Sequence, residues 1–199
     1  MTISYVVGNS LYLNITNRCP NRCEFCVRNY KQSVGDADSL WLDHEPDMDE
    51  IISDLEKRDF SKYESVVFCG YGEPLMRLDD VKQISCYIKS KANIPIRINT
   101  NGLSDLIYNR DTSQDLEGIA DVISISLNSS TPEGYDEICH SDYGLDALPA
   151  ILKFASNVKN FVPSVILSVV DTIGKDEIEK CRKLAEKAGV KFRVREYIK

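Results

Sequence analysis

The sequence lacks several features that mark large classes of proteins. None of its apolar runs approaches the roughly 20 residues that a membrane-spanning helix requires, and its first residues show no secretory pattern of basic flank, apolar segment and cleavage site. It also contains no internal repeat, low-complexity tract or proline-rich linker that would mark a domain boundary. We therefore expect a single cytoplasmic domain that spans residues 1–199 and has no membrane partner.

Positive charge is in short supply as well. The chain has 24 lysines and arginines against 31 aspartates and glutamates, which gives a formal net charge of −7. Nucleic-acid binding depends largely on lysine and arginine side chains that neutralise phosphates, so a broad nucleic-acid surface is not expected. A local basic site remains compatible with this charge.

Cysteine is present, but not in the pattern of a disulfide framework. Seven is an odd number, and three of the seven lie within eight residues of one another, at Cys19, Cys23 and Cys26. In an intracellular protein this distribution favours a metal site. The other four are far apart and are expected to be buried as small hydrophobic side chains: Cys69, Cys86, Cys139 and Cys181. For Cys69 alone, which lies near the end of the second predicted strand, a position facing the site stays open.

β-rich runs and helical segments alternate about six times along the chain. The predicted strands are residues 11–16, 65–70, 94–100, 121–127, 163–170 and 190–198. Apolar stripes at helical spacing occupy residues 48–55, 78–88, 145–155 and 178–188, and Gly189 ends the last of these helices. This alternation predicts a parallel sheet covered by helices.

The predicted strands are apolar on one side only. Leu11, Leu13 and Ile15 alternate with polar or aromatic residues, and residues 96–99 and 123–128 show the same alternation. In a curved sheet the apolar side would meet the helices, which leaves a polar concave side for a ligand or water. A complete eight-unit barrel takes about 250 residues. We therefore expect an α/β fold of the open, TIM-like kind, a partial (β/α)6 barrel with its site at the C-terminal ends of the strands.

Three thiols lie on the loop after the first predicted strand. Cys19, Cys23 and Cys26 have the spacing Cys-x3-Cys-x2-Cys. Three thiolates can bind three irons of a four-iron cube and leave the fourth iron open to a substrate, whereas clusters that only transfer electrons usually have four cysteine ligands. The alternative is a structural zinc site of three cysteines and one histidine, for which His44 is the nearest candidate.

A second motif, Gly70-Tyr71-Gly72-Glu73-Pro74, follows the second predicted strand. Glycines let the backbone approach a ligand closely, Pro74 fixes a turn, and Glu73 offers an acceptor for an ammonium group. Alone, the motif is typical of a common turn. Because it comes one strand–helix unit after the cysteines, both motifs are expected at the same edge of the sheet.

Together the motifs resemble the signature of the radical S-adenosylmethionine (SAM) superfamily, in which an aromatic residue, here Phe25, precedes the last cysteine. The resemblance implies a 4Fe–4S cluster on the three cysteines, which are then metal ligands and catalytic residues. It implies that SAM binds the open iron and is split reductively into methionine and a 5′-deoxyadenosyl radical, which takes a hydrogen from a substrate. Gly72, Glu73 and Pro74 correspond to the family's Gly-Gly-Glu-Pro segment, which contacts the amino group of SAM. Tyr71 replaces its first glycine, and the radical SAM RNA methyltransferases also have a large residue there.

Polar residues at the ends of the later strands are expected to complete the SAM site. The resemblance suggests that fourth-strand groups contact the ribose or carboxylate and that later strands frame the adenine. The expected SAM-binding residues are Asn99, Ser126, Asn128, Ser168 and Arg195. Two alternatives stay open: the dipeptide at residues 101–102 fits a turn as well as a ligand contact, and Arg195 fits a surface pair as well as a carboxylate contact.

Two loop features bear on partners. The cysteine loop is locally basic, which suits a solvated loop or the docking of an acidic electron donor, and the resemblance implies a low-potential donor of the flavodoxin or ferredoxin type. The basic residues are Arg18, Arg22, Arg28 and Lys31. Residues 35–42, which include Trp41, are expected to cap the cluster or touch substrate. With the small size and residues 194–197, this segment makes the chain look like the compact TatD-associated radical SAM subgroup.

The leading functional hypothesis is a radical SAM oxidoreductase or modifying enzyme that acts on a small molecule or short peptide, with glycyl-radical activation as one version. RNA or nucleobase modification is an alternative, because of the Gly-x-Gly-Glu-Pro form. A third is a non-enzymatic module, either a zinc site or an electron-transfer iron–sulfur protein.

Overall fold

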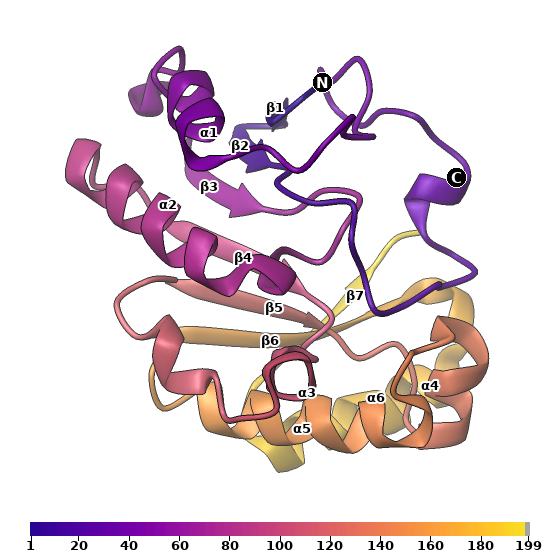
Figure 1. Cartoon of the computed structure of the whole chain (residues 1–199). Helices are drawn as coiled ribbons and strands as arrows, with labels where there is room; N and C mark the ends of the chain where they lie inside the picture. Colours follow the sequence, from indigo (N-terminus) through magenta and orange to yellow (C-terminus); the bar gives the residue numbers. More distant parts are fainter. Residues whose placement is uncertain (198–199) are drawn as a thin grey trace.

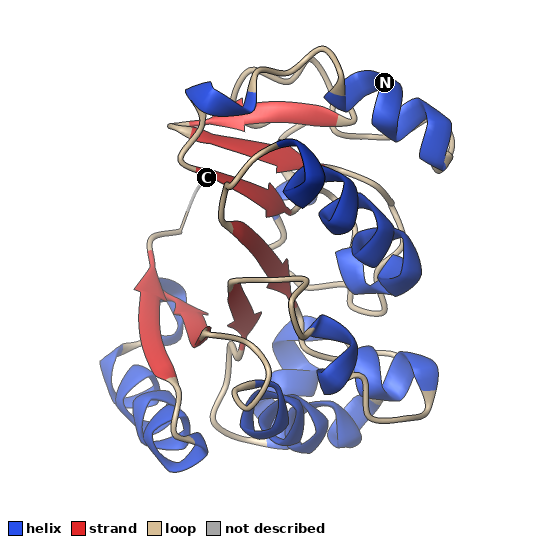
Figure 2. Cartoon of the chain, turned by 90° about the vertical axis from the view of Figure 1, so that its left-hand side faces the viewer, coloured by secondary structure: helices blue, strands red, loops and turns tan. Residues whose placement is uncertain are grey.

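A computed structural model describes residues 1–197, which form one curved sheet of seven strands in sequence order. The strands are β1 (Ser4–Val7), β2 (Ser10–Leu13), β3 (Ser65–Phe68), β4 (Ile96–Thr100), β5 (Val122–Ser126), β6 (Ser164–Val170) and β7 (Lys191–Arg195). β1 and β2 are antiparallel, and the later neighbours are parallel. Figure 2 shows a C-shaped arc, and within residues 1–197 no pairing joins β7 to β1. The expected open, partial (β/α)6 barrel is confirmed, with one strand added before it.

The helices cover the outer, convex side of this arc (Figures 1 and 2). They are α1 (Met48–Leu55), α2 (Leu78–Lys91), α3 (Ser104–Tyr108), α4 (Pro132–Cys139), α5 (Ala147–Val158) and α6 (Lys175–Ala188). Short 3-10 turns lie in the loops: η1 (Val27–Asn29), η2 (Phe60–Lys62), η3 (Pro74–Arg77), η4 (Ser113–Leu116), η5 (Gly144–Asp146) and η6 (Asp171–Ile173). All four helices expected from apolar stripes are present, and α3 and α4 are additions.

Local chemistry sets the ends of these helices. α1 begins with a capping box, in which the Asp47 carboxylate accepts a hydrogen bond from the Glu50 backbone and the Glu50 carboxylate accepts one from the Asp47 backbone. α6 ends at Gly189, whose φ of +70° is a left-handed conformation that costs glycine little. The predicted stop at Gly189 is therefore confirmed.

The core lies between the sheet and the helices. Leu11, Leu13 and Ile15 are almost completely buried there, and every second residue of β4 and β5 joins them. The intervening side chains face the concave side, where Asn99 and Ser126 remain partly exposed. One-sided burial of the strands, as their alternation predicts, therefore produces the polar inner face.

Three expectations about element boundaries need correction. β1 was not expected, although the dipeptide Gly8-Asn9 between alternating residues is a hairpin signal, and Gly8 has the positive φ of +57° that such turns require. Leu145 does not belong to the buried stripe of α5, because it lies in η5 and is exposed. The last strand ends at Arg195, and Ile198, where the predicted strand ended, lies outside the described residues.

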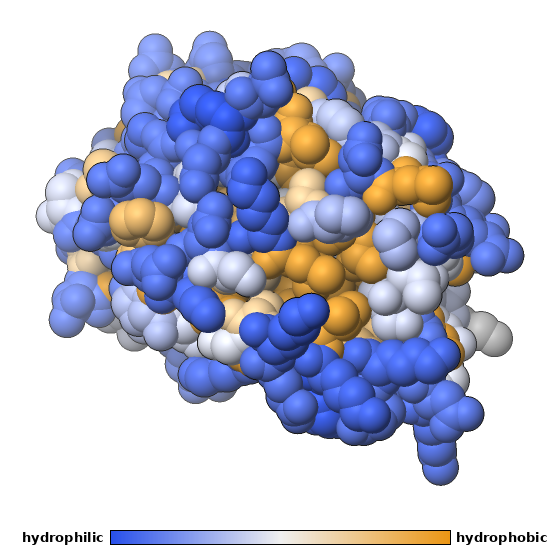
Figure 3. Space-filling view, turned by 90° about the horizontal axis from the view of Figure 1, so that it is seen from below, coloured by the Kyte–Doolittle hydropathy of each residue, from blue (hydrophilic) through white to orange (hydrophobic). Residues whose placement is uncertain are grey.

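None of the described helices combines the length and apolar composition that crossing a membrane requires. Seen from below, the molecule shows an apolar area bordered by hydrophilic residues (Figure 3). Apolar side chains therefore reach the surface on that side of the molecule.

Candidate functional site

The cysteine loop follows β2 at the carboxyl edge of the sheet and is fixed by backbone hydrogen bonds to the end of α4. Its carbonyl and amide groups bond the segment around Cys139: the Arg22 amide donates to the Cys139 carbonyl at 2.9 Å, and the Glu24 amide donates to the Ile138 carbonyl at 3.1 Å. These bonds pin the loop on both sides of Cys23.

Side chains strengthen this contact. The Asn21 amide donates to the Tyr135 hydroxyl at 2.8 Å, and the thiols of Cys23 and Cys139 are hydrogen-bonded. Cys139 was expected to be a buried hydrophobe, and it is buried, but it also supports one of the three loop cysteines. The signal for α4 was available in Thr131-Pro132, which form an N-cap and a first-turn proline.

Glu73 joins the second motif to the end of β4. Its buried carboxylate accepts hydrogen bonds from the Leu75 amide at 3.0 Å, the Thr100 hydroxyl at 2.7 Å and the Asn101 amide at 2.7 Å. Burial nevertheless raises the pKa of Glu73 to about 7, because three neutral donors only partly replace water. A carboxylate has about four acceptor positions, so room for about one further donor remains.

Gly72 packs directly against the backbone of the cysteine loop. A Cβ atom here would lie 2.3 Å from the Thr16 carbonyl oxygen and 2.7 Å from that of Arg18. The next amide, that of Glu73, donates to the same Arg18 carbonyl at 2.8 Å. Only glycine permits this approach, so the two motifs form one unit, as their positions along the chain predict.

Tyr71, which departs from the family pattern, anchors the segment after the cysteine loop. Its buried ring packs with Tyr5 and Leu40, its hydroxyl donates to the Lys31 carbonyl, and the Trp41 ring meets it edge-on at 5.2 Å between centroids. The segment therefore covers the β1–β2 end of the inner face. Its predicted role as a cap over the cluster or a substrate contact stays a prediction.

The thiols are set up to be protonated in the metal-free protein. Burial, helped by the charge of Glu73, raises the pKa of Cys19 to about 12. The hydrogen bond to Cys139 and burial raise the pKa of Cys23, and burial raises that of Cys26. Iron binds thiolates, so loading this loop must release protons.

The donor set fits an iron–sulfur cube better than a single ion. Within residues 1–197, no three histidine, cysteine or acidic side chains converge closely enough to hold one metal ion. A cube bonds each thiolate through a different iron, so its ligands need not converge on one point. His44, the fourth ligand of the zinc alternative, instead contacts the Glu50 carboxylate at 2.9 Å. The three thiols therefore match the donor chemistry of a cube with one open iron.

The other predicted SAM residues lie along the inner face. The Asn99 oxygen accepts from Arg97 Nε at 2.8 Å, Ser126 accepts from Arg195 at 3.3 Å, and the Ser168 hydroxyl donates to a carbonyl of β5. Asn128 has a positive φ of +59° and donates to Cys139 Sγ at 3.6 Å. Among these predicted SAM residues, two buried atoms lack a protein partner, the Asn128 side-chain oxygen and Arg195 Nε, so each has unused capacity to bond a ligand.

The dipeptide at residues 101–102 forms the turn that was one of the two open alternatives, and its contact with a ligand stays a prediction. Gly102 has a φ of +78°, and the Asn101 side-chain oxygen accepts from the Leu103 amide, as in a turn. The nitrogen of the same side chain lies 3.9 Å from Cys19 Sγ. Asn101 therefore also contacts the thiol loop, which sequence reasoning had not placed there.

Two of the four basic residues on the cysteine loop are paired with carboxylates, and a third bonds backbone carbonyls. Arg18 binds Glu45 through two nitrogens at 2.7 and 2.9 Å, and Arg22 binds Asp142 at 2.6 Å. Arg28 donates to backbone carbonyls of the two motifs, at Tyr71 and Asn21. The basic loop thus braces the site, which weakens the case for docking an acidic donor through these residues.

The remaining cysteines only partly follow expectation. Cys181 is buried, as predicted, but Cys86 is exposed on α2 and Cys69 is half-buried at the inner face. The polar side of α2 faces solvent, and Cys86 lies on that side, whereas the apolar stripe points inward. The prediction of burial is therefore wrong for Cys86, whereas Cys69 faces the inner side, the alternative left open for it.

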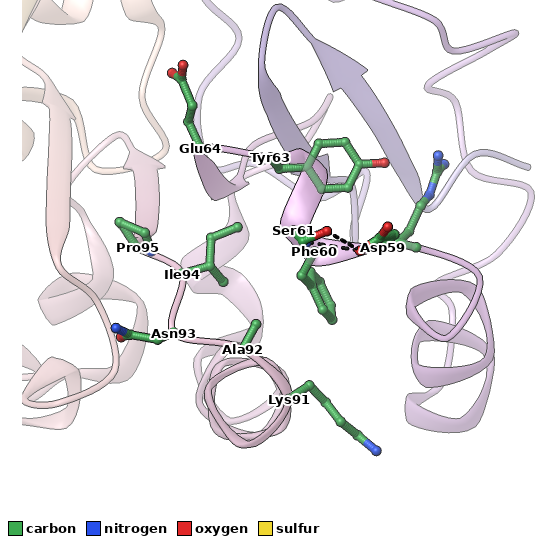
Figure 4. Close-up of a pocket in the computed structure, with 11 residues that line it drawn as sticks. Asp59, Phe60, Ser61, Tyr63, Glu64, Lys91, Ala92, Asn93, Ile94 and Pro95 are labelled. Carbon is green, nitrogen blue, oxygen red and sulfur yellow. Dashed lines mark hydrogen bonds between the residues drawn. The ribbon is translucent and has the colours of Figure 1, made fainter.

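A groove of about 630 Å³ lies at the opposite, amino edge of the sheet. It is lined by residues 58–61, 63–64 and 91–95. In Figure 4 its labelled side chains point in different directions, and Asp59 bonds Ser61 of the same turn. Because catalytic groups of β/α barrels lie at the carboxyl edge, this groove is not the candidate site.

Comparison with known families agrees with the geometry. The profile of the radical SAM superfamily matches residues 13–185, which include both motifs and most of the sheet. The chain belongs to the radical SAM superfamily. This family of enzymes uses a 4Fe–4S cluster and SAM, and the predicted family and cofactors are confirmed. The narrower TatD-associated resemblance stays a prediction.

Two curated relatives are considerably longer than this chain. The tungsten-containing aldehyde ferredoxin oxidoreductase cofactor-modifying protein of Pyrococcus furiosus is 28% identical over 173 residues, which is 81% of this chain and 43% of the relative. The probable dual-specificity RNA methyltransferase RlmN of Pseudothermotoga lettingae is 32% identical over 129 residues, 60% of this chain and 34% of the relative. The chain therefore spans less than half the length of either relative.

Solved structures share the fold at low sequence identity. SuiB of Streptococcus suis has a TM-score of 0.68 at 16% identity, covering 96% of this chain and 40% of that chain. Methylornithine synthase (PylB) has a TM-score of 0.58 at 14% identity, covering 95% and 53%. These likenesses support the open barrel, and SuiB has also been solved bound to SAM and to its precursor peptide SuiA.

Proposed function

We propose that Cys19, Cys23 and Cys26 hold a 4Fe–4S cluster and that this chain is the radical-generating core of an enzyme that modifies a small molecule or a peptide. When bound and reduced, the cluster supplies one electron that cleaves SAM to methionine and a 5′-deoxyadenosyl radical, which abstracts a substrate hydrogen. The observation that carries this proposal is a three-thiol loop locked by Gly72 and Glu73 to the neighbouring strand end.

The chain's own residues have separable roles in this proposal. Glu73, already fixed by three donors, presents its remaining acceptor capacity to the amino group of SAM, while Gly72 and Pro74 hold the loop shape. Asn128 and Arg195 offer the unpartnered oxygen and nitrogen to the polar groups of SAM. Phe25, which the family resemblance assigns to the SAM site, is partly buried and packs against the core next to Cys26 in the sequence.

The residues at the inner face are expected to play lesser parts. Asn99 and Ser126 lie between arginines and the site, so they orient charged side chains as much as they contact SAM. The Ser168 hydroxyl already donates to a carbonyl of β5, so we expect Ser168 to contact SAM through packing rather than through a hydrogen bond. A low-potential donor of the flavodoxin or ferredoxin type supplies the electron.

The substrate class rests on two supports. SuiB binds a precursor peptide, and the Pyrococcus relative is described as modifying a cofactor, so peptide and small-molecule substrates both occur among similar proteins. RNA or nucleobase modification is the second candidate, favoured by the likeness to the probable RNA methyltransferase. The net charge of −7 counts against an RNA surface on this chain.

The test is anaerobic reconstitution with iron and sulfide, followed by reduction, addition of SAM and chromatography for 5′-deoxyadenosine. We expect about four irons per chain, from the cluster type, and 5′-deoxyadenosine that depends on the reductant. A protein that takes up zinc but no iron would refute the cluster. A complete cluster that leaves SAM intact would favour the electron-transfer alternative.

A further inference from the structure

The inner face of the barrel carries three arginines that come from both halves of the sheet. Arg97 is on β4, and Arg193 and Arg195 are on β7, where they pair in register with Ser168 and Val170. Their sequence neighbours point the other way: Ile96 and Ile98 are buried in the core, and Phe192 packs against α6. Alternation along the strands therefore directs all three arginines to the concave side.

These arginines are close enough to act on one another. The positive charge of Arg193 lowers the pKa of both Arg97 and Arg195, and Arg97 lowers that of Arg195, although burial is the larger cause for each. Arg193 also lies near the Tyr12 hydroxyl on β2, across the open barrel. The three side chains thus form one group inside the arc, which we name the inner arginine cluster.

No carboxylate neutralises the inner arginine cluster. Among residues 1–197, none of the ion pairs involves Arg97, Arg193 or Arg195, whereas Arg18, Arg22, Arg77 and Arg110 each have an acidic partner. In a chain with 31 acids and 24 bases, an acid-free cluster is a local reversal of charge.

The cluster also has unused hydrogen-bonding capacity. Arg97 donates to Asn99 and Arg195 donates to Ser126, but the buried Nε of Arg195 has no partner. Each guanidinium has five N–H donors in a fork that fits an oxyanion, and a buried donor without a partner destabilises the folded chain. An anionic ligand at Arg97 and Arg193 would remove the repulsion, and SAM beside Arg195 would supply the partner that its Nε lacks.

The position of the cluster suits the substrate rather than the iron–sulfur cluster. Arg97 precedes Asn101, the residue beside Cys19, by four positions along β4, which corresponds to about 13 Å of extended strand. Arg195 is the last residue of β7, so it lies nearer the carboxyl edge of the sheet than Arg193. It is close to Cys23 and borders the proposed SAM site. An anion at Arg97 and Arg193 would therefore be separated from the thiol loop by about 13 Å of the inner face, along which the rest of a small molecule and SAM would lie.

We propose that Arg97 and Arg193, bordered by Arg195, bind a carboxylate or phosphate group of a small-molecule substrate inside the open barrel. This inference deepens the proposed function, on which it relies for the reaction, by naming the class of substrate as an anionic small molecule. The anion fixes one end of the substrate in the barrel, and the group that loses a hydrogen faces the carboxyl edge.

The test uses the full chain without iron or SAM. Thermal unfolding is followed in inorganic phosphate and in acetate, each against chloride at equal ionic strength, because a ligand that binds only the folded state raises the Tm. We expect at least one of the two anions to raise the Tm.

Arg97→Gln and Arg193→Gln should each weaken the anion affinity derived from these Tm shifts by about tenfold or more, because each removes charged hydrogen bonds. Arg182→Gln, an outward-facing arginine over Phe192, is the matched control and should keep the wild-type response.

The outcomes separate this inference from the cluster proposal. If neither anion raises the Tm, or if the rise survives in both variants, the inference is overturned while the cluster proposal stands. If a short RNA oligonucleotide protects the chain through Arg97 and the free anions do not, the ligand is a nucleic acid and the small-molecule assignment is wrong. Should Arg97→Gln fail to fold, the exposed position of Arg193 makes Arg193→Gln the deciding variant. A preference for phosphate over acetate, or the reverse, tells which oxyanion the cluster takes.

Discussion

The two edges of the sheet differ in how their loops are tied together. At the carboxyl edge, the loops after β2, β3 and β4 are joined by the Glu73 carboxylate, by the Glu73 amide bond to Arg18 and by the close approach of Gly72. At the amino edge, the groove between residues 58–64 and 91–95 has fewer such links: Arg58 donates to Ser4 and Glu64 accepts from Asn9, whereas Asp59 bonds Ser61 within its own turn.

This difference shows that the presence of a groove does not locate a site. The amino-edge groove is roomy, but its groups do not converge on a point. The carboxyl edge has buried acceptors and donors fixed by several elements at once, which is the rigidity that a reactive site requires. Substitutions at the carboxyl edge should therefore affect both stability and chemistry, and those at the amino edge should affect neither strongly.

The largest effect is expected from the loop cysteines. Replacing Cys19, Cys23 or Cys26 with alanine should abolish both the bound cluster and the formation of 5′-deoxyadenosine, because only two thiolates would then be left to bind the cluster. Iron and sulfide content and product chromatography measure the two losses. Cys86→Ala on the outer surface of α2 is the matched control and should retain both. Production of 5′-deoxyadenosine by a triple-cysteine variant would show that the assignment is wrong.

A smaller effect is expected from Gly72→Ala. The added Cβ would meet the backbone oxygen of Thr16 at 2.3 Å, and backbone yields less readily than a side chain. Overpacking of this kind costs about 1–3 kcal/mol, which for a chain of this size lowers the Tm by roughly 2–12 °C. Thermal unfolding of the metal-free protein measures the shift. Asn93→Ala in the exposed amino-edge loop should leave the Tm within about 2 °C, given that surface changes are usually within 0.5 kcal/mol. Equal shifts in the two variants would remove the proposed distinction between the edges.

Much of the fold follows from local patterns in the sequence. Alternation in residues 11–15 and 96–99 separates the core face from the inner face, and the stripe of residues 178–188 with Gly189 defines α6. β1 was missed because its four residues form a strand only through pairing with β2 and carry little periodicity of their own. α4 was missed because its buried face is narrow, only Tyr135 and Cys139, so capping was its main signal.

The candidate site was predictable where a motif specifies it. The spacing of the cysteines and the position of the Gly-x-Gly-Glu-Pro segment predict from the sequence alone that both motifs lie at one edge of the sheet. The partners of these motifs were not predictable, because Cys139, Thr100 and Asn101 are brought to them by separate strands and helices. The inner arginine cluster was missed for the same reason: Arg97 and Arg193 are 96 positions apart along the chain, and only the sheet register brings them to one face.

The smallest effect is expected from Glu73→Gln, which tests whether burial of the Glu73 carboxyl group makes stability depend on pH. Burial raises its pKa from 4.5 to about 7, so between these values the folded chain binds this proton more tightly than the unfolded chain. The contribution of Glu73 to stability is therefore fully present below pH 4.5 and is lost as pH rises from there through 7, with about 1 kcal/mol of the loss between pH 6 and 8. Chemical denaturation of the metal-free protein at several pH values should show this loss in the wild type and not in Glu73→Gln. The exposed Glu133→Gln is the control and should keep the wild-type slope. A difference between wild type and Glu73→Gln that stays constant with pH would mean that the Glu73 carboxylate is not the buried, desolvated link between the two carboxyl-edge loops.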